Sequence, residues 1–298
     1  MNLTRSLLTL PPMTFAEKPL TPKLPADLTG RTALITGASS GIGQALALAL
    51  AEAGVAVCLL GRDAARLTDT AARARRCGGT VATLALELTD DAALESVPAR
   101  LPAAFARLDF LIHGAGIVCH GLLAAQPVAE LDQQYRINVR VPYLLTQTLL
   151  PRLAADAQVV FINSMAALIS RASNGQYAAT KAALKALADS LREELRPVGQ
   201  RVLSVYPGKV ATPLTAQLHA EENLAYDPTL YIQPADLAGL VLGVLRLPAT
   251  ALLHDLPVRS VPRPAVPLPP STGHSEPAFL SSASAPPGAF HPQPAFAL

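Results

Sequence analysis

Residues 31–54 read RTALITGASSGIGQALALALAEAG, and this stretch decides the fold. A short apolar run that ends in glycine predicts a buried strand. The helix that follows has apolar residues at a period close to 3.6 residues, and Gly54 ends it. A strand, a glycine turn and a helix N-terminus together predict an anion site. The reason is that free backbone N–H groups and the positive end of the helix dipole point at one place.

The glycines of this turn have separate tasks. Gly37 lets the chain leave the strand sharply, Gly41 lets a pyrophosphate approach the backbone, and Gly43 lets the helix pack closely on the sheet. Their spacing is T-G-x-x-x-G-x-G rather than the G-x-G-x-x-G of the commoner dinucleotide fingerprint. By itself, this spacing is also compatible with an ordinary tight turn between a strand and a helix.

The same residues fit a second motif, which belongs to another class of enzyme. Residues 37–41, GASSG, match G-x-S-x-G, in which Ser39 would be the nucleophile of an α/β-hydrolase. That fold needs several strands before its nucleophile, whereas a proline-rich segment precedes this one. Asp236 and His254 are the best available acid and base, and strand-like residues flank His254. The hydrolase therefore stays a remote alternative.

Apolar runs and amphipathic segments alternate along the rest of the chain. This alternation predicts an α/β protein with a doubly wound parallel sheet (a Rossmann fold) and helices on both faces. The expected strands are 33–35, 55–60, 81–86, 110–112, 159–162 and 202–205, with an edge strand within 251–258. After the first helix, the expected helices are one that ends at 76, then 91–108 with a break at its prolines, 131–149, 176–195 and 237–247.

The composition divides the chain into one domain and two ends. The expected domain is residues 29–258, preceded by a leader at 1–28 and followed by a tail at 259–298 that is rich in Pro, Ala and Ser. Segments of this kind bury too little apolar surface to offset the entropy of ordering, so both ends are expected to be disordered.

Charge and length argue against several partners. A formal net charge of +2 favours no polyanion, so no nucleic-acid binding is expected. No apolar stretch is long enough to span a membrane, and the apolar run at residues 3–10 is too short for a signal peptide.

The cysteine and histidine usage points to a reducing compartment. The 3 cysteines are odd in number and have no C-x-x-C spacing, which argues against disulfides and a zinc site. The 6 histidines have no metal-ligand spacing, so no metal is expected. Together with the lack of a membrane span, these features predict a cytoplasmic protein.

Several polar residues fall where parallel sheets bind their ligands. Tyr177 and Lys181 are spaced i and i+4, so their side chains share one face of a helix. Ser164 closes the fifth strand, at the carboxyl edge of the sheet. Asn138 falls in the long helix before that strand, and Thr212 follows a Pro-Gly turn. A Tyr-x-x-x-Lys pair alone is common, but these companions make it specific.

In this order and spacing, the motifs resemble the short-chain dehydrogenase/reductase family. The resemblance runs from about residue 28 to 258 and rests on TGASSGIG (36–43), INS (162–164), YAATK (177–181) and PGKVAT (207–212). It implies a catalytic tetrad of Asn138, Ser164, Tyr177 and Lys181. It also implies that the cofactor is held by Gly37, Ser39, Ser40, Gly41, Ile42, Gly43, Arg62, Glu87, Leu88, Gly114, Ala115, Gly116, Tyr177, Lys181, Pro207, Gly208, Val210 and Thr212.

The chemistry of carbonyl reduction asks for these residue types. A free tyrosine, with a pKa of about 10, holds its proton too tightly to be an acid near neutral pH. The Lys181 ammonium and an oxidised nicotinamide would stabilise the phenolate of Tyr177 and lower that pKa. Ser164 would hydrogen-bond the substrate oxygen that Tyr177 protonates. By resemblance, Lys181 also holds the nicotinamide ribose and Asn138 holds a water that relays protons.

Two positions depart from the commonest wording of the family. His113 begins the sequence HGAG, where the family often has Asn-Asn-Ala-Gly, so a hydrogen bond on the adenosine side or a strand-stabilising amide is expected to be missing. His113 is equally compatible with a structural and a functional role. Glu87 stands where the family often has Asp, and its longer reach leaves its contact with the adenine amino group open.

The end of the second strand favours NADP(H) over NAD(H). Gly61 stands where an acid would bind the 2′-hydroxyl of NAD, and Arg62 follows it. An arginine suits the dianionic 2′-phosphate of NADP through a bidentate contact. Asp63 would either oppose that phosphate or cap the next helix.

The sequence thus predicts an NADP(H)-dependent oxidoreductase that acts on a carbonyl or secondary alcohol of an apolar small molecule. The expected pocket walls are residues 166–168, 173–176 and 213–231, the last of which is long enough to act as a lid. The resemblance implies a homodimer or homotetramer. A non-catalytic dinucleotide-binding regulator or scaffold is the alternative from another class, and the unusual tail is its one support.

Overall fold

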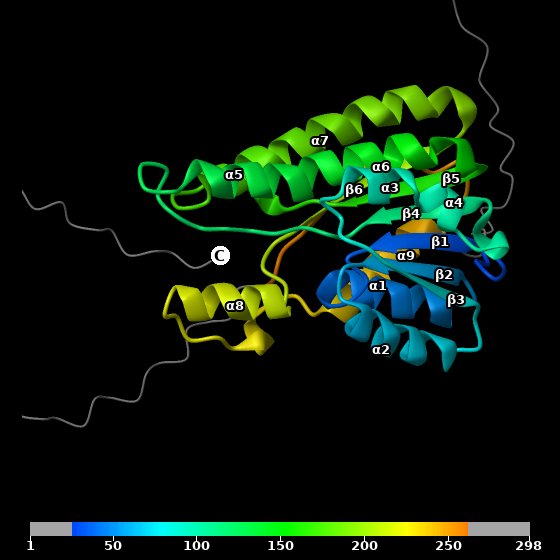
Figure 1. Ribbon diagram of the computed structural model, residues 1–298, viewed down its shortest axis with the longest axis horizontal. Helices are drawn as coiled ribbons and strands as arrows, with labels where there is room; N and C mark the ends of the chain where they lie inside the picture. The colour runs from blue at the N-terminus through cyan, green and yellow to red at the C-terminus, as the bar shows by residue number, and fades with distance from the viewer. Residues whose placement is uncertain (1–25, 262–298) are drawn as a thin grey trace, which may run out of the picture.

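The computed structural model describes residues 26–261, in which a parallel sheet lies between two layers of helices (Figure 1). The strand order in the described part is β3-β2-β1-β4-β5-β6-β7. Every neighbouring pair runs parallel. The strands are β1 (Thr32–Thr36), β2 (Ala56–Gly61), β3 (Val81–Ala85), β4 (Leu108–His113), β5 (Leu153–Ile162), β6 (Arg201–Pro207) and β7 (Asp255–Val258). The expected doubly wound parallel sheet is confirmed.

Helices cover both faces of the sheet. In Figure 1, α1 and α2 lie below it and α5, α6 and α7 lie above. The helices are α1 (Gly41–Glu52), α2 (Ala64–Arg75), α3 (Asp91–Glu95), α4 (Val97–Arg100), α5 (Val128–Tyr135), α6 (Val141–Leu149), α7 (Gly175–Leu195), α8 (Pro213–Glu221) and α9 (Pro234–Leu245).

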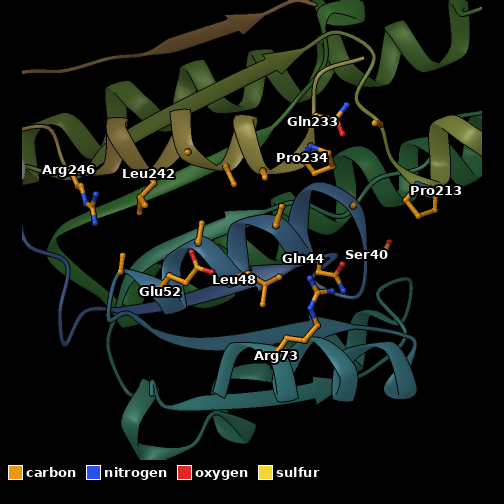
Figure 2. A pocket seen from close by; sticks show the side chains of 18 residues that line it. Ser40, Gln44, Leu48, Glu52, Arg73, Pro213, Gln233, Pro234, Leu242 and Arg246 are labelled. Carbon is orange, nitrogen blue, oxygen red and sulfur yellow. The ribbon is translucent and has the colours of Figure 1, made fainter. Parts of the chain in front are cut away.

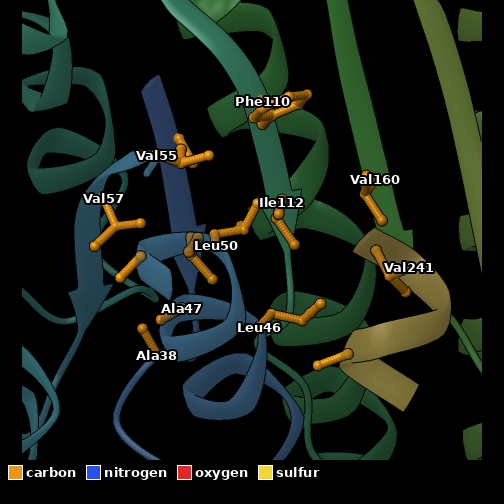
Figure 3. Close-up of a cluster of buried hydrophobic side chains, with 14 of the residues drawn as sticks. Ala38, Leu46, Ala47, Leu50, Val55, Val57, Phe110, Ile112, Val160 and Val241 are labelled. Carbon is orange, nitrogen blue, oxygen red and sulfur yellow. The ribbon is translucent and has the colours of Figure 1, made fainter. Parts of the chain in front are cut away.

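The first strand shows why the sheet needs two covering layers. Ala33 and Ile35 belong to the apolar cluster shared with α1, α2 and α9, whereas Leu34 belongs to the cluster on the opposite face. Successive side chains of a strand point to opposite faces, so an unbroken apolar run is buried on both. Figure 3 shows Leu46 and Leu50 of α1, which belong to the same cluster as Ala33 and Ile35.

The strand order reverses between β1 and β4, which places a crevice at their carboxyl ends. From β1 the chain proceeds outward to β2 and β3, and then returns to pair β4 with the other edge of β1. Ligands of doubly wound sheets bind at such a switch point. The glycine turn after β1 and the residues after β4 therefore face the same crevice.

Three predicted elements differ from the structure. The expected helix 131–149 is divided into α5, a π-helical stretch η2 (Arg136–Arg140) and α6. The expected helix 91–108 has the predicted break, here between α3 and α4, but its last residue already belongs to β4. The fifth strand begins at Leu153 rather than 159. Prolines explain the break, because they cannot continue a helix from its interior.

The segment expected to form a lid contains a helix that the sequence analysis did not predict. This helix, α8, has Pro213 in its first turn, and the Thr212 side chain accepts from the N–H of Thr215 at 3.2 Å. A capping threonine followed by proline is a helix-start signal. Thr212 and Pro213 are thus the sequence feature that predicts the start of α8.

The described domain starts earlier than the expected boundary at residue 29. Leu28 is buried in the core, and the Ala26 N–H donates to the carbonyl of Arg246 at 3.1 Å. Residues 1–25 and 262–298 lie outside the described residues, and so does most of the predicted leader and tail. Within residues 26–261, no helix is long and apolar enough to cross a membrane, and no cluster of His, Cys, Asp or Glu could hold a metal ion.

Candidate functional site

The glycine turn is built from contacts between backbones. Gly37 and Gly41 have φ of +69° and +55°, in the left-handed region that favours glycine. A Cβ on Gly43 would stand 2.4 Å from the carbonyl oxygen of Gly37, so the helix can approach the turn only without a side chain there. Ser40 precedes α1 without a side-chain cap, and no acidic residue lies in the first turn. These features fit the turn to a pyrophosphate.

Thr36 joins the glycine turn to the segment after β4. Its buried hydroxyl accepts from the N–H groups of Gly114 and Ala115, at 3.1 and 3.2 Å. A Cβ on Gly37 would stand 2.8 Å from the backbone of the same segment. The sequence analysis gave Thr36 no role, although it is the first residue of the TGASSGIG motif. Residues 114–116 therefore lie against the turn, as the cofactor prediction requires.

The four residues of the expected tetrad come together at the carboxyl edge of β5. The Lys181 Nζ lies 5.8 Å from the centre of the Tyr177 ring, and the Ser164 hydroxyl hydrogen-bonds the Tyr177 side chain. A Cβ on Gly116 would stand 3.2 Å from Asn138 Oδ1 and 3.6 Å from Lys181 Nζ. This arrangement places an acid, a hydroxyl donor and an ammonium in one cluster beside the glycine turn.

Burial shifts the pKa values of both ionisable members of the tetrad. Desolvation lowers the pKa of Lys181 to about 8, and its Nζ donates to the carbonyl of Ile162 at 3.1 Å. Desolvation raises the pKa of Tyr177, and the hydrogen bond from Ser164 opposes that rise. The protein alone therefore does not lower the tyrosine pKa. The lower pKa that the sequence predicts for Tyr177 therefore depends on the positive charge that a bound oxidised nicotinamide would add.

Asn138 lies in the π-helical stretch and is held by its amide. Its Oδ1 accepts from the Ile117 N–H and its Nδ2 donates to the Ile117 carbonyl, both at 2.9 Å. Nδ2 also donates to the Thr180 hydroxyl at 3.0 Å, and this hydroxyl donates to the carbonyl of Tyr177 at 2.8 Å. The amide thus connects the segment after β4 to the helix that carries Tyr177. Single π turns often occur at functional sites.

Asn163 and Thr180 are supporting residues that the sequence analysis missed. The Nδ2 of Asn163 donates to the carbonyl of Lys181 at 3.2 Å, and its Oδ1 accepts from the Ser164 N–H at 3.0 Å. Both residues stand inside quoted motifs, INS and YAATK, next to or between the residues that they position. Their place in those motifs was the signal that could have found them.

His113 has a structural environment. The ring is buried, stacks on Phe161 with centroids 4.9 Å apart, and places Nε2 at 2.9 Å from the Thr146 hydroxyl. Its Nδ1 has no hydrogen-bond partner in the described structure. Burial lowers the pKa of His113 to about 3, so the ring is neutral at physiological pH. Of the two roles left open by the sequence, the contacts favour the structural one.

The end of β2 carries an exposed cation. Arg62 forms no close ion pair within the described residues, and its charge contributes to the lowered pKa of the Glu87 carboxyl. Asp63 caps α2 by accepting from the Arg66 N–H at 3.0 Å and pairs with the Arg66 guanidinium at 3.2 Å. Its carboxylate is thereby engaged, so the capping alternative is confirmed. The Ser39 hydroxyl lies 3.7 Å from where a Cβ on Gly61 would stand, which brings the glycine turn to the same place.

The two residues expected to flank the adenine lie at the end of β3. Glu87 accepts from the N–H and the hydroxyl of Thr89, at 3.1 and 3.0 Å, and the pKa of Glu87 is lowered chiefly by that backbone contact. Leu88 is buried in an apolar cluster. Because one carboxylate oxygen of Glu87 is occupied by Thr89, a contact with an adenine amino group would use the other one.

The PGKVAT motif closes the crevice on the side of β6. The Gly208 N–H donates to the carbonyl of Val258 at 2.8 Å, and buried Val210 is bridged to Ile232. The Thr212 Cγ2 lies 3.2 Å from where a Cβ on Gly41 would stand. This end of the motif therefore meets the glycine turn, as the resemblance implies.

The residues of the hydrolase alternative lie on separate elements. Ser39 is in the glycine turn, Asp236 is in the first turn of α9, and exposed His254 precedes β7. No hydrogen bond or ion pair between any two of them is present in the described part of the chain. The arrangement supplies no base to the Ser39 hydroxyl.

One cavity of the described structure is a groove outside the tetrad. It has a volume of about 780 Å³ and runs between α1 and α9 (Figure 2). Leu48 of α1 and Leu242 of α9 line it, and so do Arg73 and Arg246. Only its end near Ser40 touches the glycine turn. The groove is therefore not the catalytic crevice.

Comparisons with known proteins agree with this geometry. A profile of the short chain dehydrogenase family matches residues 31–223, more than half of the chain. An uncharacterized oxidoreductase of Staphylococcus aureus is 30% identical over 238 residues, which cover 78% of this chain and 99% of that protein.

Two solved structures have the same fold. An alcohol dehydrogenase from Thermococcus sibiricus, complexed with 5-hydroxy-NADP, has a TM-score of 0.71 and 26% identity, covering 78% of this chain and 98% of that one. A short chain dehydrogenase from Burkholderia cenocepacia, in complex with NADP, has a TM-score of 0.70 and 28% identity over the same shares of both chains.

Proposed function

Because this chain belongs to the short-chain dehydrogenase family and is an NAD(P)-dependent oxidoreductase, we propose that it reduces a carbonyl group of an apolar small molecule with NADPH. The observation that carries the proposal is the meeting of Ser164, Tyr177 and Lys181 beside the glycine turn. The reverse reaction would oxidise the corresponding secondary alcohol.

The residues of the crevice fit a dinucleotide. Without side chains, Gly37 and Gly43 let the turn pack directly on neighbouring backbone. The N-terminus of α1, which has no acidic residue in its first turn, then suits a pyrophosphate. Buried Lys181 is in place to hold the nicotinamide ribose, as the resemblance implies. When bound, the nicotinamide supplies the hydride for reduction or accepts it for oxidation.

The chain itself supplies the proton and the orientation. Tyr177 donates its hydroxyl proton to the carbonyl oxygen, which becomes the alcohol oxygen of the product. Ser164 hydrogen-bonds the same oxygen and aligns it. The Lys181 ammonium stabilises the phenolate that remains, since its pKa of about 8 keeps most of it protonated at neutral pH. Asn138 is held by Ile117 and positions Tyr177 through the Thr180 hydroxyl. We infer that Asn138 also holds the relay water.

Arg62 supports NADPH as the cofactor. The exposed guanidinium follows Gly61 at the end of β2, and Asp63 is engaged in capping α2. A bidentate contact between arginine and a phosphate would distinguish the 2′-phosphate of NADPH from the 2′-hydroxyl of NADH. Two related structures contain NADP or a derivative of it, which agrees with this preference.

The substrate class rests on the apolar side chains of the expected walls. Leu168, Leu214 and Leu224 are exposed in the segments that follow β5 and β6. Exposed leucines near a polar cluster suit an apolar molecule with one carbonyl group, because pockets combine apolar walls with few polar groups.

Two further properties belong to the proposal. The exposed aromatic rings of Tyr135 and Tyr143, on α5 and α6, support a homodimer or homotetramer through these helices. The described chain contains the free thiols of Cys58, Cys77 and Cys119, and these support a cytoplasmic location.

A carbonyl panel followed through NADPH absorbance tests the proposal. We expect turnover of at least one apolar ketone or aldehyde, and we expect Tyr177→Phe to lower kcat by roughly 10²- to 10⁴-fold, because the general acid is lost. NADPH should still bind this variant, as measured by its fluorescence, because Lys181 and the glycine turn remain.

The matched control is Tyr143→Phe, which removes an exposed phenol from α6 and should leave kcat unchanged. If the parent protein binds NADPH but turns over no carbonyl compound, the reductase is ruled out. The protein would then be better explained as a non-catalytic dinucleotide-binding regulator.

A further inference from the structure

One helix stands apart from the layers that cover the sheet. Figure 1 shows α8 away from both of them. Its first end meets the glycine turn, since the capping residue Thr212 lies 3.2 Å from where a Cβ on Gly41 would stand. Its 9 residues span about 14 Å of helix. The helix therefore leads away from the cofactor side of the crevice.

The other end of α8 meets the segment that follows β4. His120 Nδ1 and Glu222 Oε1 are 2.6 Å apart, although 102 positions separate the two residues in the sequence. Their side chains are 29% and 35% exposed, so the pair is partly shielded from water. A carboxylate at a helix C-terminus is disfavoured by the helix dipole. The imidazole partner offsets that cost.

The segment that carries His120 is fastened to the catalytic wall. The Gly121 N–H donates to the carbonyl of Ser173, just before the helix of the catalytic tyrosine, at 2.8 Å. On the other side of His120, the Cys119 N–H donates to Gln134 Oε1 of α5 at 3.1 Å. His120 thus stands between two residues whose backbones are bonded to this wall.

Glu222 follows a helix whose side chains are bonded to the segment after it. His219 is buried, and its Nδ1 lies 2.8 Å from the carbonyl of Thr215. A carbonyl only accepts, so Nδ1 donates and Nε2 accepts from the Tyr231 hydroxyl at 2.8 Å. The ring of Tyr226 packs on both, with centroids 5.4 Å from His219 and 5.8 Å from Tyr231. These contacts tie α8 to the segment that returns to the sheet.

We propose that His120 and Glu222 are positioning residues that latch α8 across the substrate crevice. The latch joins the cofactor side, where α8 begins, to the wall that carries Tyr177. This inference rests on the proposed reductase function. Neither residue is placed to touch the reacting atoms, so the latch retains the substrate without changing the proton donor. Its loss should raise KM and leave kcat in place.

Two single variants and their exchange test the latch in the full-length protein. His120→Ala removes one partner, Glu222→Gln removes the charge of the other, and His120→Glu combined with Glu222→His restores the pair in the opposite order. The matched control is Glu221→Gln, which removes the neighbouring charge of α8. Glu221 accepts from Gln217 within the same helix, at 2.8 Å, and forms no contact with His120.

The first readout needs no turnover. Amide hydrogen exchange of residues 213–224, in the protein without ligand, should be about threefold to fivefold faster in both single variants than in the parent and in Glu221→Gln. The exchanged pair should return to the parent rate. Equal rates in all variants would show that the contact does not hold α8, and would overturn the latch.

The second readout separates KM from kcat. With a carbonyl compound that the parent reduces, we expect KM to rise about threefold to fivefold in the single variants while kcat and the Kd of NADPH stay unchanged. Faster exchange with an unchanged KM would overturn the role in substrate retention. Absence of turnover in the parent would instead remove the proposed function, whereas a parent that turns over with equal exchange rates would remove the latch alone.

Discussion

The two halves of the crevice are built from different kinds of contact. In the cofactor half, backbone lies on backbone: a Cβ on Gly43 would stand 2.4 Å from the Gly37 oxygen, and one on Gly114 would stand 2.7 Å from the Thr36 oxygen. Real Cβ atoms do not approach so closely, so these positions admit glycine alone. This half is specified by the absence of side chains.

The substrate half is specified by side chains that touch one another. The His120 side chain contacts the Glu222 carboxylate, and the His219 ring is hydrogen-bonded to the Tyr231 hydroxyl. Many residue pairs could make such contacts at the same backbone positions. The comparison teaches that the cofactor half tolerates almost no substitution, whereas the substrate half can be altered one residue at a time.

The largest effect is expected where the cofactor half is filled. Gly43→Ala would force the first turn of α1 away from the glycine turn, because the new Cβ meets a backbone oxygen that cannot move independently. We expect NADPH binding to be abolished and the free energy of unfolding to fall by about 3 kcal/mol. Fluorescence titration with NADPH and urea denaturation measure the two quantities.

Gly239→Ala is the matched control for this substitution. Gly239 also lies in a helix, but a Cβ there would meet nothing within 4 Å. We expect this variant to bind NADPH normally and to gain about 0.5–1 kcal/mol of stability, because alanine favours helices over glycine. If both variants had the same NADPH affinity and stability, the backbone contact at Gly43 would not specify the cofactor half.

A smaller effect is expected where the cofactor half does use a side chain. Arg62→Ala should raise the Kd of NADPH by roughly 10- to 100-fold, since a charge-assisted contact with the 2′-phosphate contributes about 1.5–3 kcal/mol. The Kd of NADH should change little. Isothermal titration with both cofactors gives the ratio.

Arg66→Ala serves as its control, because Arg66 is exposed nearby and already pairs with Asp63. That variant should keep the preference for NADPH. If Arg62→Ala leaves the ratio of the two Kd values unchanged, the preference for NADPH does not come from the end of β2.

The last prediction concerns the pH dependence of stability that buried His113 produces. His113 has a pKa of about 3 in the folded protein, against about 6.5 in an unfolded chain, so unfolding takes up a proton between these pH values. Stability should therefore fall with decreasing pH across that window, by at most about 1.4 kcal/mol per pH unit from this group. Urea denaturation at pH 7, 6 and 5 measures the slope.

His113→Asn should remove this part of the slope, since an amide does not titrate, whereas exposed His254→Asn should leave it in place. Parallel stability curves for the parent and His113→Asn would contradict the assignment of His113 as a neutral buried support.

The secondary structure of the expected cofactor half could be predicted from the sequence because its determinants are local. The strand, the turn and the helix of residues 31–54 follow from consecutive residues, and the spacing of Tyr177 and Lys181 follows from one helix. Arg62 and Asp63 follow directly from the end of β2. In each case, the interacting groups lie within a few positions of one another.

The substrate half was predicted poorly because its contacts are distant in the chain. Nothing near His120 shows that Glu222, 102 positions later, lies 2.6 Å away. The supporting roles of Thr36 and Thr180 were missed for the same reason, since each hydroxyl acts on a different segment. The raised pKa of Tyr177 also follows from burial, which depends on the whole fold.

The π-helical stretch at Asn138 makes chain length there as important as composition. Each residue of an α-helix turns the chain by about 100° around the axis, and a π turn contains one residue more. Because the π turn already takes up one extra residue, the insertion of a second residue at this point would rotate the whole of α6. Leu145 and Leu149, both fully buried, would then swing from the interior into solvent. An insertion there should thus do more harm than almost any exchange of one amino acid for another.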